Sequence, residues 1–312
     1  MHIAIHRQQL KSAMLPVAII VGALCYKWIG YVTFLSPYLL FMMLFITYCR
    51  VKPSEFKPKG SQLLLLAIQM GLSAAVYLLL LPVNHTLAEG IFICMFIPTA
   101  TAAPVITSMM GGSISFVATY SLLCNALVAL TGSAVLALVG DYHVFGFWES
   151  TWLIMQRVFP LLIIPIIASM ALRYAWPRAH RAVAQSQTLS FYIWVLALLL
   201  IVGSCVSFVI QHWDENQLGL LLWIVAGALG ACLVQFAIGR WLGRRLMKSP
   251  GYERQYPGHD DLRVSCAQSL MQKNTVLAVW LAMSYMTPLA SVAPAAYIAW
   301  QNIINSAQLA RY

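Results

Sequence analysis

The chain has 312 residues, of which 61% are hydrophobic and only 9% are charged. Its mean hydropathy of +0.78 lies outside the range of soluble globular domains, in which about 25% of residues are charged. The formal net charge of +10 does not indicate nucleic-acid binding, because the basic residues neither form one patch nor alternate with exposed aromatic residues. The composition predicts a polytopic, all-α membrane protein with the lipid bilayer, and no nucleic acid, as a partner.

Apolar segments separated by charged or Pro/Gly-rich turns predict about ten transmembrane helices. The second segment is short, which leaves the number open by one. The predicted spans are 13–29, 34–49, 61–82, 86–111, 113–140, 152–175, 188–210, 217–242, 262–286 and 288–309.

The basic residues predict how these spans are oriented. If the N-terminus lies inside, nearly all of the 19 Lys and Arg residues fall on the inner side. The exceptions are Lys27 and Arg157, which lie toward the other side, and Lys273, which lies within a span. This asymmetry satisfies the positive-inside rule. We therefore predict an integral protein of a bacterial inner (plasma) membrane with both termini in the cytoplasm.

The fourth segment is interrupted by Pro98 and Pro104, which enclose Thr99 and Thr101. A proline removes a backbone donor and clashes with the preceding turn, so a break is predicted near Pro98. An ordinary proline kink is the alternative. A break exposes backbone carbonyls and amides at membrane depth, where a protein interior or a wet cavity must satisfy them.

Lys273 lies near the middle of the ninth segment, too deep for its ammonium to reach the membrane surface. A charge at that depth is costly and needs partners. Its neighbours Gln268, Gln272 and Asn274 add hydrogen-bonding capacity that a lipid-facing helix does not need. We predict a second interruption and a binding site at Lys273. A purely structural ammonium, satisfied by helix carbonyls, is the alternative.

The two interruptions occupy equivalent places in the two halves of the chain. Five spans precede the outer loop 141–151 and five follow it, which predicts two inverted repeats, 1–140 and 152–312. In this arrangement helices 4 and 9 cross near the middle of the membrane. Such paired interruptions indicate the binding site of a secondary transporter.

Four stretches, in order along the chain, are similar to segments of the bile acid:sodium symporter family. They are 35–44 (LSPYLLFMML), 51–56 (VKPSEF), 98–105 (PTATAAPV) and 269–278 (SLMQKNTVLA). The family has P-G-G-T-A-S-N-V in its fourth helix and E-V-G-M-Q-N-S-G-L-A in its ninth, and this chain matches each motif in part. The chain resembles a divergent, bacterial-type member of the family.

The resemblance implies a panel domain of spans 1, 2, 6 and 7 and a core domain of spans 3–5 and 8–10. It also implies secondary transport of a small organic anion by alternating access, which family members couple to two sodium ions. On this basis we expect a transporter and not an enzyme, with an organic anion as substrate and no cofactor. The oligomeric state stays open.

The resemblance also implies that most of the family's sodium ligands are replaced here. The serine and asparagine of the fourth helix fall on Ala103 and Pro104, and the glutamate of the ninth helix falls on Gln268. The serine and threonine of the fifth helix fall on Val117 and Ser121. A hard cation needs several oxygen ligands, and Ala, Pro and Val side chains supply none.

Lys273 falls where the family has an asparagine, which suggests that its ammonium takes the place of a sodium ion. It would then hold the anion or exchange a proton, and transport would be sodium-independent, either facilitated or proton-linked. The alternative is sodium-coupled symport through one residual metal site at Gln69 and Gln272. The predicted substrate- and ion-binding residues are Lys273, Gln272, Gln268, Asn274, Thr99, Thr101, Gln69 and Ser121.

Two other classes of function were weighed against transport. A membrane-embedded enzyme would need a positioned acid, base or nucleophile, and the sequence offers no buried His or Asp pair for it. A non-transporting membrane sensor would need an output domain, and no soluble domain is visible in the sequence. Both readings are less favoured than transport.

Overall fold

The computed structural model covers the whole chain and describes residues 14–51, 54, 57–100, 102–140, 147–211, 218–250, 252 and 261–310. These residues are almost entirely helical, and the β-structure found among them is one isolated bridge. Three described helices, Gly60–Leu80, Ile114–Gly132 and Leu218–Met247, are long and apolar enough to cross a membrane, and a bent pair at 177–204 makes a fourth candidate. The all-α membrane fold predicted from composition is thus confirmed at this level.

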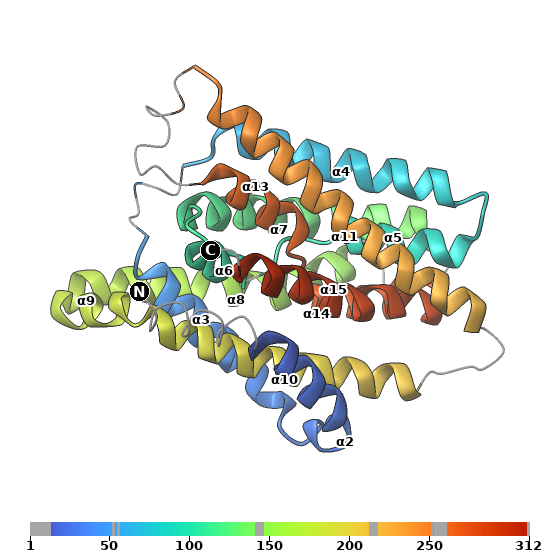
Figure 1. Cartoon of the computed structure of the whole chain (residues 1–312), viewed down its shortest axis with the longest axis horizontal. Helices are drawn as coiled ribbons and strands as arrows, with labels where there is room; N and C mark the ends of the chain where they lie inside the picture. Colours follow the sequence, from blue (N-terminus) through green and yellow to red (C-terminus); the bar gives the residue numbers. More distant parts are fainter. Residues whose placement is uncertain are drawn as a thin grey trace.

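Figure 1 shows how the described helices are arranged. In chain order they are the stretch Met14–Leu24, α2 (Tyr26–Ile29), η1 (Thr33–Leu35), α3 (Ser36–Tyr48), α4 (Gly60–Leu80), α5 (His85–Phe96), α6 (Ala103–Met109), α7 (Ile114–Val139), α8 (Phe147–Ala175), α9 (Pro177–Gln185), α10 (Gln187–Gln211), α11 (Leu218–Met247), α13 (Leu262–Met271), α14 (Thr275–Tyr285), η4 (Pro288–Ser291) and α15 (Val292–Leu309).

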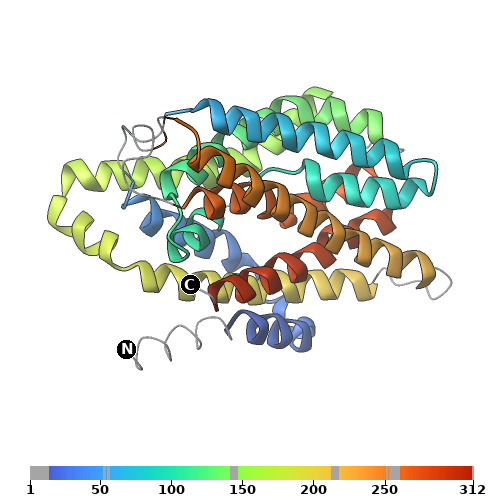
Figure 2. The ribbon, with the colours of Figure 1, turned by 45° about the horizontal axis from the view of Figure 1, so that its top comes forward.

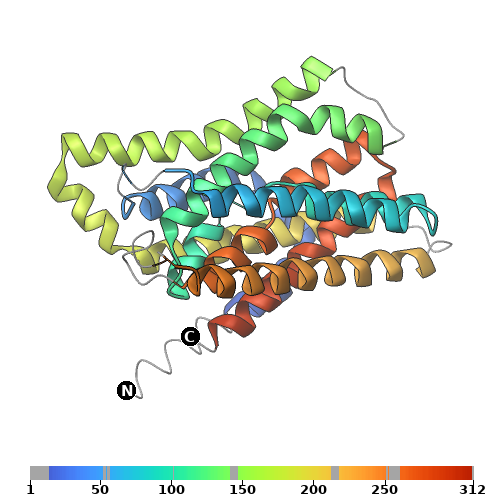
Figure 3. The ribbon, with the colours of Figure 1, turned by 90° about the horizontal axis from the view of Figure 1, so that it is seen from above.

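At two places the structure is helical where the sequence prediction has a loop. The basic stretch after Ala175 forms α9, which begins at a proline in the first turn and lies at one end of the molecule in all three views (Figures 1, 2 and 3). At its C-terminal end α11 continues five residues beyond the predicted span, to Met247. There Arg240 lies over the Phe236 ring and Arg245 over the Trp241 ring, so the charged heads rest on aromatic surface.

The helices divide into two groups. α3 and α10 pack side by side along one edge with α2 beside them, and α4, α5 and α11 pack along the opposite edge (Figure 1). Gly22 lets the first helical stretch approach α10, because a Cβ there would meet the Leu199 carbonyl oxygen at 2.5 Å. α8 lies along α3 and α7 and covers one face (Figure 3).

α11 packs closely against α13. A Cβ on Gly239 would come within 2.6 Å of Ala267 Cα and of the Cys266 carbonyl oxygen. Backbone atoms cannot move aside as a flexible side chain can. The glycine therefore sets the position of α13, the helix that leads to Lys273.

We predict that Gly239→Ala lowers the stability of the protein by about 1–3 kcal/mol, because the added methyl group forces α11 and α13 apart. Thermal unfolding of the detergent-purified protein measures this loss. Gly230 is the matched control, because it lies on the same helix and a Cβ there meets no heavy atom within 4 Å. Gly230→Ala should leave stability unchanged or slightly raised. Equal effects of the two substitutions would contradict the packing argument.

Both interruptions predicted from the sequence are present. α5 ends at Phe96 and α6 begins at Ala103, while α13 ends at Met271 and α14 begins at Thr275. At the first break Ile97 is extended (φ −56°, ψ 149°), as is usual for a residue before proline. The second break contains no proline, and Gln272 leaves the helix in an extended conformation (φ −75°, ψ 110°). Contacts with the first break hold it there, as described next.

Candidate functional site

The two interrupted segments meet in an antiparallel pairing. Thr99 and Lys273 form the isolated β-bridge. The Ala100 amide donates to the Gln272 carbonyl oxygen at 3.0 Å, and the Asn274 amide donates to the Pro98 carbonyl oxygen at 2.9 Å. Backbone amides and carbonyls that lose their helical hydrogen bonds at one break therefore bond to those at the other break. Buried backbone groups need such partners.

Two polar side chains satisfy the carbonyl groups at the C-terminal end of α5. The Lys273 ammonium donates to the Met95 carbonyl oxygen at 3.0 Å. The Gln69 amide of α4 donates to the carbonyl oxygens of Phe96 and Ile97 at 3.1 and 3.0 Å. A helix C-terminus carries partial negative charge, so a cation is stabilised at this position.

The C-terminal end of α13 is satisfied in the same way. The Thr99 hydroxyl donates to the Ser269 carbonyl oxygen at 2.7 Å, and the Tyr297 hydroxyl of α15 donates to the Met271 carbonyl oxygen at 2.8 Å. Thr99 and Tyr297 are fully buried. The crossing is therefore a cluster in which each broken helix end is capped by groups from other elements.

Lys273 is 1% exposed and has no carboxylate as a partner. Among the described residues no Asp or Glu oxygen lies within 4.0 Å of its ammonium; the ion pairs found there are His85 with Glu89 and Arg263 with Asp261. The backbone amide of Lys273 donates to the side-chain oxygen of Gln301 at 3.0 Å. Among the described residues the charge is thus compensated by the Met95 carbonyl at the end of α5 and not by a carboxylate.

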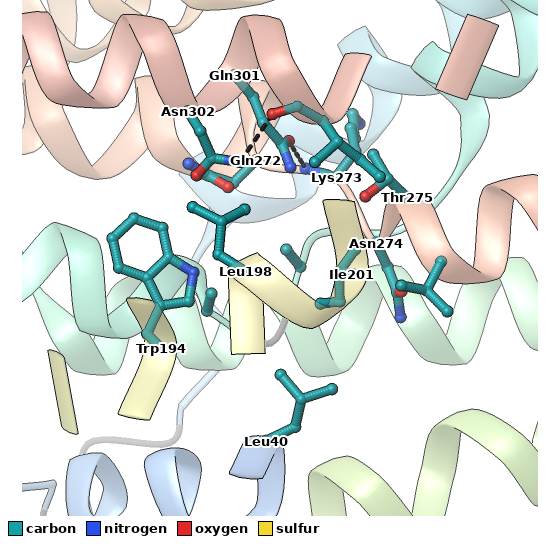
Figure 4. Close-up of a pocket in the computed structure, with 14 residues that line it drawn as sticks. Leu40, Trp194, Leu198, Ile201, Gln272, Lys273, Asn274, Thr275, Gln301 and Asn302 are labelled. Atoms are coloured by element: carbon teal, nitrogen blue, oxygen red, sulfur yellow. Dashed lines mark hydrogen bonds between the residues drawn. The ribbon is translucent and has the colours of Figure 1, made fainter. Parts of the chain in front are cut away.

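A cavity of about 60 Å³ opens beside the crossing, between the two groups of helices. Apolar side chains of α3 and α10, namely Leu40, Trp194, Leu198 and Ile201, face the polar residues of the crossing and of α15 (Figure 4). Met95 is not among its lining residues. Lys273 borders the cavity, and its ammonium donates to the Met95 carbonyl oxygen at the end of α5.

The polar wall of the cavity offers hydrogen-bond donors. The N-terminal residues of α14, Asn274, Thr275 and Val276, line it, and a helix N-terminus carries partial positive charge. Gln272 also lines it, is 2% exposed, and its side-chain nitrogen has no hydrogen-bond partner among the described residues. A helix N-terminus with an unpaired amide beside it is suited to an anionic group such as a carboxylate.

The structure brings most of the predicted site residues together, although not all in the predicted role. Gln268 donates to Asn305 at 3.1 Å, and Asn274 caps α14 by accepting from the Leu277 amide at 3.3 Å. The Ser121 hydroxyl donates to the Thr99 carbonyl oxygen at 3.4 Å, next to the crossing. Thr101 lies outside the described residues.

The residual sodium site at Gln69 and Gln272 stays a prediction. The side-chain oxygen of Gln69 accepts from the Tyr120 hydroxyl at 2.6 Å, and its nitrogen is occupied by α5. A cation at Gln69 would share this oxygen with the Tyr120 hydroxyl, because an amide oxygen has two lone pairs. Within the described part of the chain, no three His, Cys, Asp or Glu residues are grouped as a metal site would need.

Sequence reasoning missed the contribution of α15. Gln301, Asn302 and Asn305 are each at most 5% exposed, and all three lie at the crossing or the cavity. Their spacing in an otherwise apolar segment is a helical pattern that places amides on one face. Tyr120 and Tyr297 were also missed, because their position beside the breaks depends on tertiary packing.

No family model matches the chain, and no curated protein matches it. The argument for function therefore rests on the geometry of the crossing and on the residues that form it.

Proposed function

We propose that the protein is a secondary transporter that moves a small organic anion across a membrane by alternating access. The observation that carries this proposal is the antiparallel pairing of two broken helices beside a buried Lys273. Irregular backbone at membrane depth is tolerated where it lines a binding site, and paired breaks of this kind are characteristic of transporters.

The anion would bind in the cavity between the two groups of helices. Its charged group would face the N-terminus of α14 and the Gln272 amide, and its apolar part would face Trp194 and Leu198. The group containing α3, α8 and α10 would act as a panel, and the group containing the crossing would act as a core. Movement of one against the other would open the cavity to either side in turn.

The cation that such a site needs would be Lys273. Its ammonium stabilises the C-terminal end of α5, where a bound sodium ion would otherwise supply charge. Transport in this proposal is independent of sodium. The proposal also includes ten spans in two inverted five-helix repeats and kinship with the bile acid:sodium symporter family, supported by the equivalent positions of the two breaks and by the motifs at 98–105 and 269–278.

We predict that small monoanions raise the thermal stability of the purified protein equally in sodium and in potassium salts. A ligand that binds the native state stabilises it by mass action. The measurement uses C2–C6 carboxylates and C1–C6 alkanesulfonates at matched ionic strength, followed by uptake of each stabilising anion into proteoliposomes.

Each outcome decides between functions. Stabilisation and uptake in both salts support sodium-independent transport. Stabilisation in sodium alone supports a residual site at Gln69 and Gln272 and leaves Lys273 a structural role. Stabilisation without uptake indicates a sensor, and the absence of both contradicts the proposed substrate class.

A further inference from the structure

Four buried amide side chains follow one side of α15 toward its C-terminal end. Gln301, Asn302, Asn305 and Gln308 are 5%, 2%, 0% and 6% exposed. From Gln301 to Gln308 the helix advances about 10 Å. The sequence assigns these residues no role, and the proposed anion cavity uses only the first two of them.

The amides of α15 lie against polar residues of α13. The backbone amide of Lys273 donates to the side-chain oxygen of Gln301. One turn away, the side-chain nitrogen of Gln268 donates to the side-chain oxygen of Asn305 at 3.1 Å. Residue numbers fall along α13 as they rise along α15, so the two helices run antiparallel at this contact. Gln308 continues the same row by another turn, toward the N-terminal end of α13. We call these amide side chains, together with the Ser269 hydroxyl, the amide row: Gln268, Ser269, Gln272, Gln301, Asn302, Asn305 and Gln308.

Several atoms of the amide row have no hydrogen-bond partner among the residues that the structure describes. They are Gln268 Oε1, Ser269 Oγ, Gln272 Nε2, Asn302 Oδ1, Asn305 Nδ2 and both polar side-chain atoms of Gln308. Such buried atoms are rare in proteins, and ordered water usually satisfies those that occur. A series of them on two packed segments, with donors and acceptors but no charge, has the chemistry of a passage that holds water.

The passage would end at the one charged group of the crossing. The titratable groups that face the Lys273 ammonium are the thiols of Cys94 on α5, Cys124 on α7 and Cys232 on α11. The phenols of Tyr120 and Tyr297 belong to the same crossing, where Tyr120 donates to Gln69 and Tyr297 donates to the Met271 carbonyl oxygen. α4, α14 and α15 contain no Asp, Glu, Lys or Arg, and Arg263 of α13 pairs with Asp261.

We propose that the amide row is a water-filled passage through which Lys273 exchanges a proton with the solution at the C-terminal end of α15. The ammonium gives its proton to the nearest water, the amine keeps the electron pair, and the return step reverses this. This inference rests on the proposed function, to which it adds the coupling ion: one proton moves with one anion. Lys273 carries its proton while the anion is bound, and once the anion has left the ammonium and the amine interconvert through the passage.

Cysteine labelling of the purified full-length chain tests whether the row is wet. Asn305→Cys and Ser269→Cys should react with the water-soluble reagent methanethiosulfonate ethylammonium, with peptide mass spectrometry locating the label. Ile303→Cys is the control on the same helix, because Ile303 is 45% exposed on an apolar surface. If both buried cysteines are labelled faster than the cysteine at position 303, the result supports the passage. If neither buried cysteine is labelled while the cysteine at position 303 is, the result overturns it.

Reductive methylation tests proton exchange, because only the uncharged amine attacks formaldehyde, and cyanoborohydride then reduces the imine that forms. Lys273 should be methylated in the native protein and lose most of this modification in Asn305→Leu, while the exposed Lys248 is methylated equally in both. No methylation of Lys273 in the native protein, or unchanged methylation in Asn305→Leu, would overturn the proton route. Neither experiment needs an anion, so both are independent of the uptake test of the proposed function.

Discussion

Lys273→Met should abolish anion transport and leave the protein as stable as before, or more stable. Methionine keeps about the length of the side chain but removes its charge. The end of α5 then loses the cation that, in the proposed function, takes the place of a sodium ion. The lost hydrogen bond to Met95 costs about 0.5–3 kcal/mol. Removal of a buried charge that has no carboxylate partner offsets this, because burying a lone charge costs several kcal/mol.

Proteoliposome uptake and thermal unfolding are measured on the same preparations. Lys248→Met is the matched control, because Lys248 is exposed and its loss should change neither quantity. Lys273→Arg keeps a charge that does not dissociate, so it should retain anion binding while losing any response of uptake to a pH gradient. Native transport by Lys273→Met would show that the anion is handled without the lysine charge.

The interruption at Pro98 could be predicted because its cause is local. Proline acts on its own turn and on the residue before it, whatever surrounds them. The interruption at Lys273 was predicted from the depth of its charge, yet no local rule ends α13 at Met271. Its extended backbone is held by hydrogen bonds to Pro98 and Ala100, about 170 residues away in the sequence.

The direction of the hydrogen bonds at the site could not be predicted. An amide such as Gln69 can act as donor or acceptor, and the sequence allowed it to be a sodium acceptor or a hydrogen-bonding contact between helices. In the structure its nitrogen satisfies two carbonyls of α5, because that helix ends beside it. Which role a glutamine takes depends on the packing of α4 against α5, and this is a tertiary property.

The amides of α15 show the opposite case, in which the pattern was present and was overlooked. Gln301, Asn302, Asn305 and Gln308 share one side of the helix because they are spaced by about one and two turns. Polar groups in a membrane helix generally face a protein interior or a cavity. α9 was missed for another reason: it is short, basic and polar, so a search for apolar segments passes over it.

Gln69→Leu should destabilise the protein by several kcal/mol and weaken stabilisation by anions. The substitution leaves the Phe96 and Ile97 carbonyls and the Tyr120 hydroxyl without a partner that they have in the native structure. Each buried polar group left unsatisfied costs about 1–3 kcal/mol. The end of α5 would then shift, and with it the pairing of Thr99 with Lys273 that forms one wall of the cavity.

Ser73→Ala is the matched control, because Ser73 is also buried on α4 but donates to Met70 of its own helix. It should change the unfolding temperature little, since the helix backbone keeps its own hydrogen bonds. If Gln69→Leu were as stable as Ser73→Ala, the α5 carbonyls would have to be satisfied by another donor. The Lys273 ammonium, whose remaining N–H groups lie at the end of α5, is the candidate for that donor. The double variant Gln69→Leu/Lys273→Met would then unfold far more easily than either single variant.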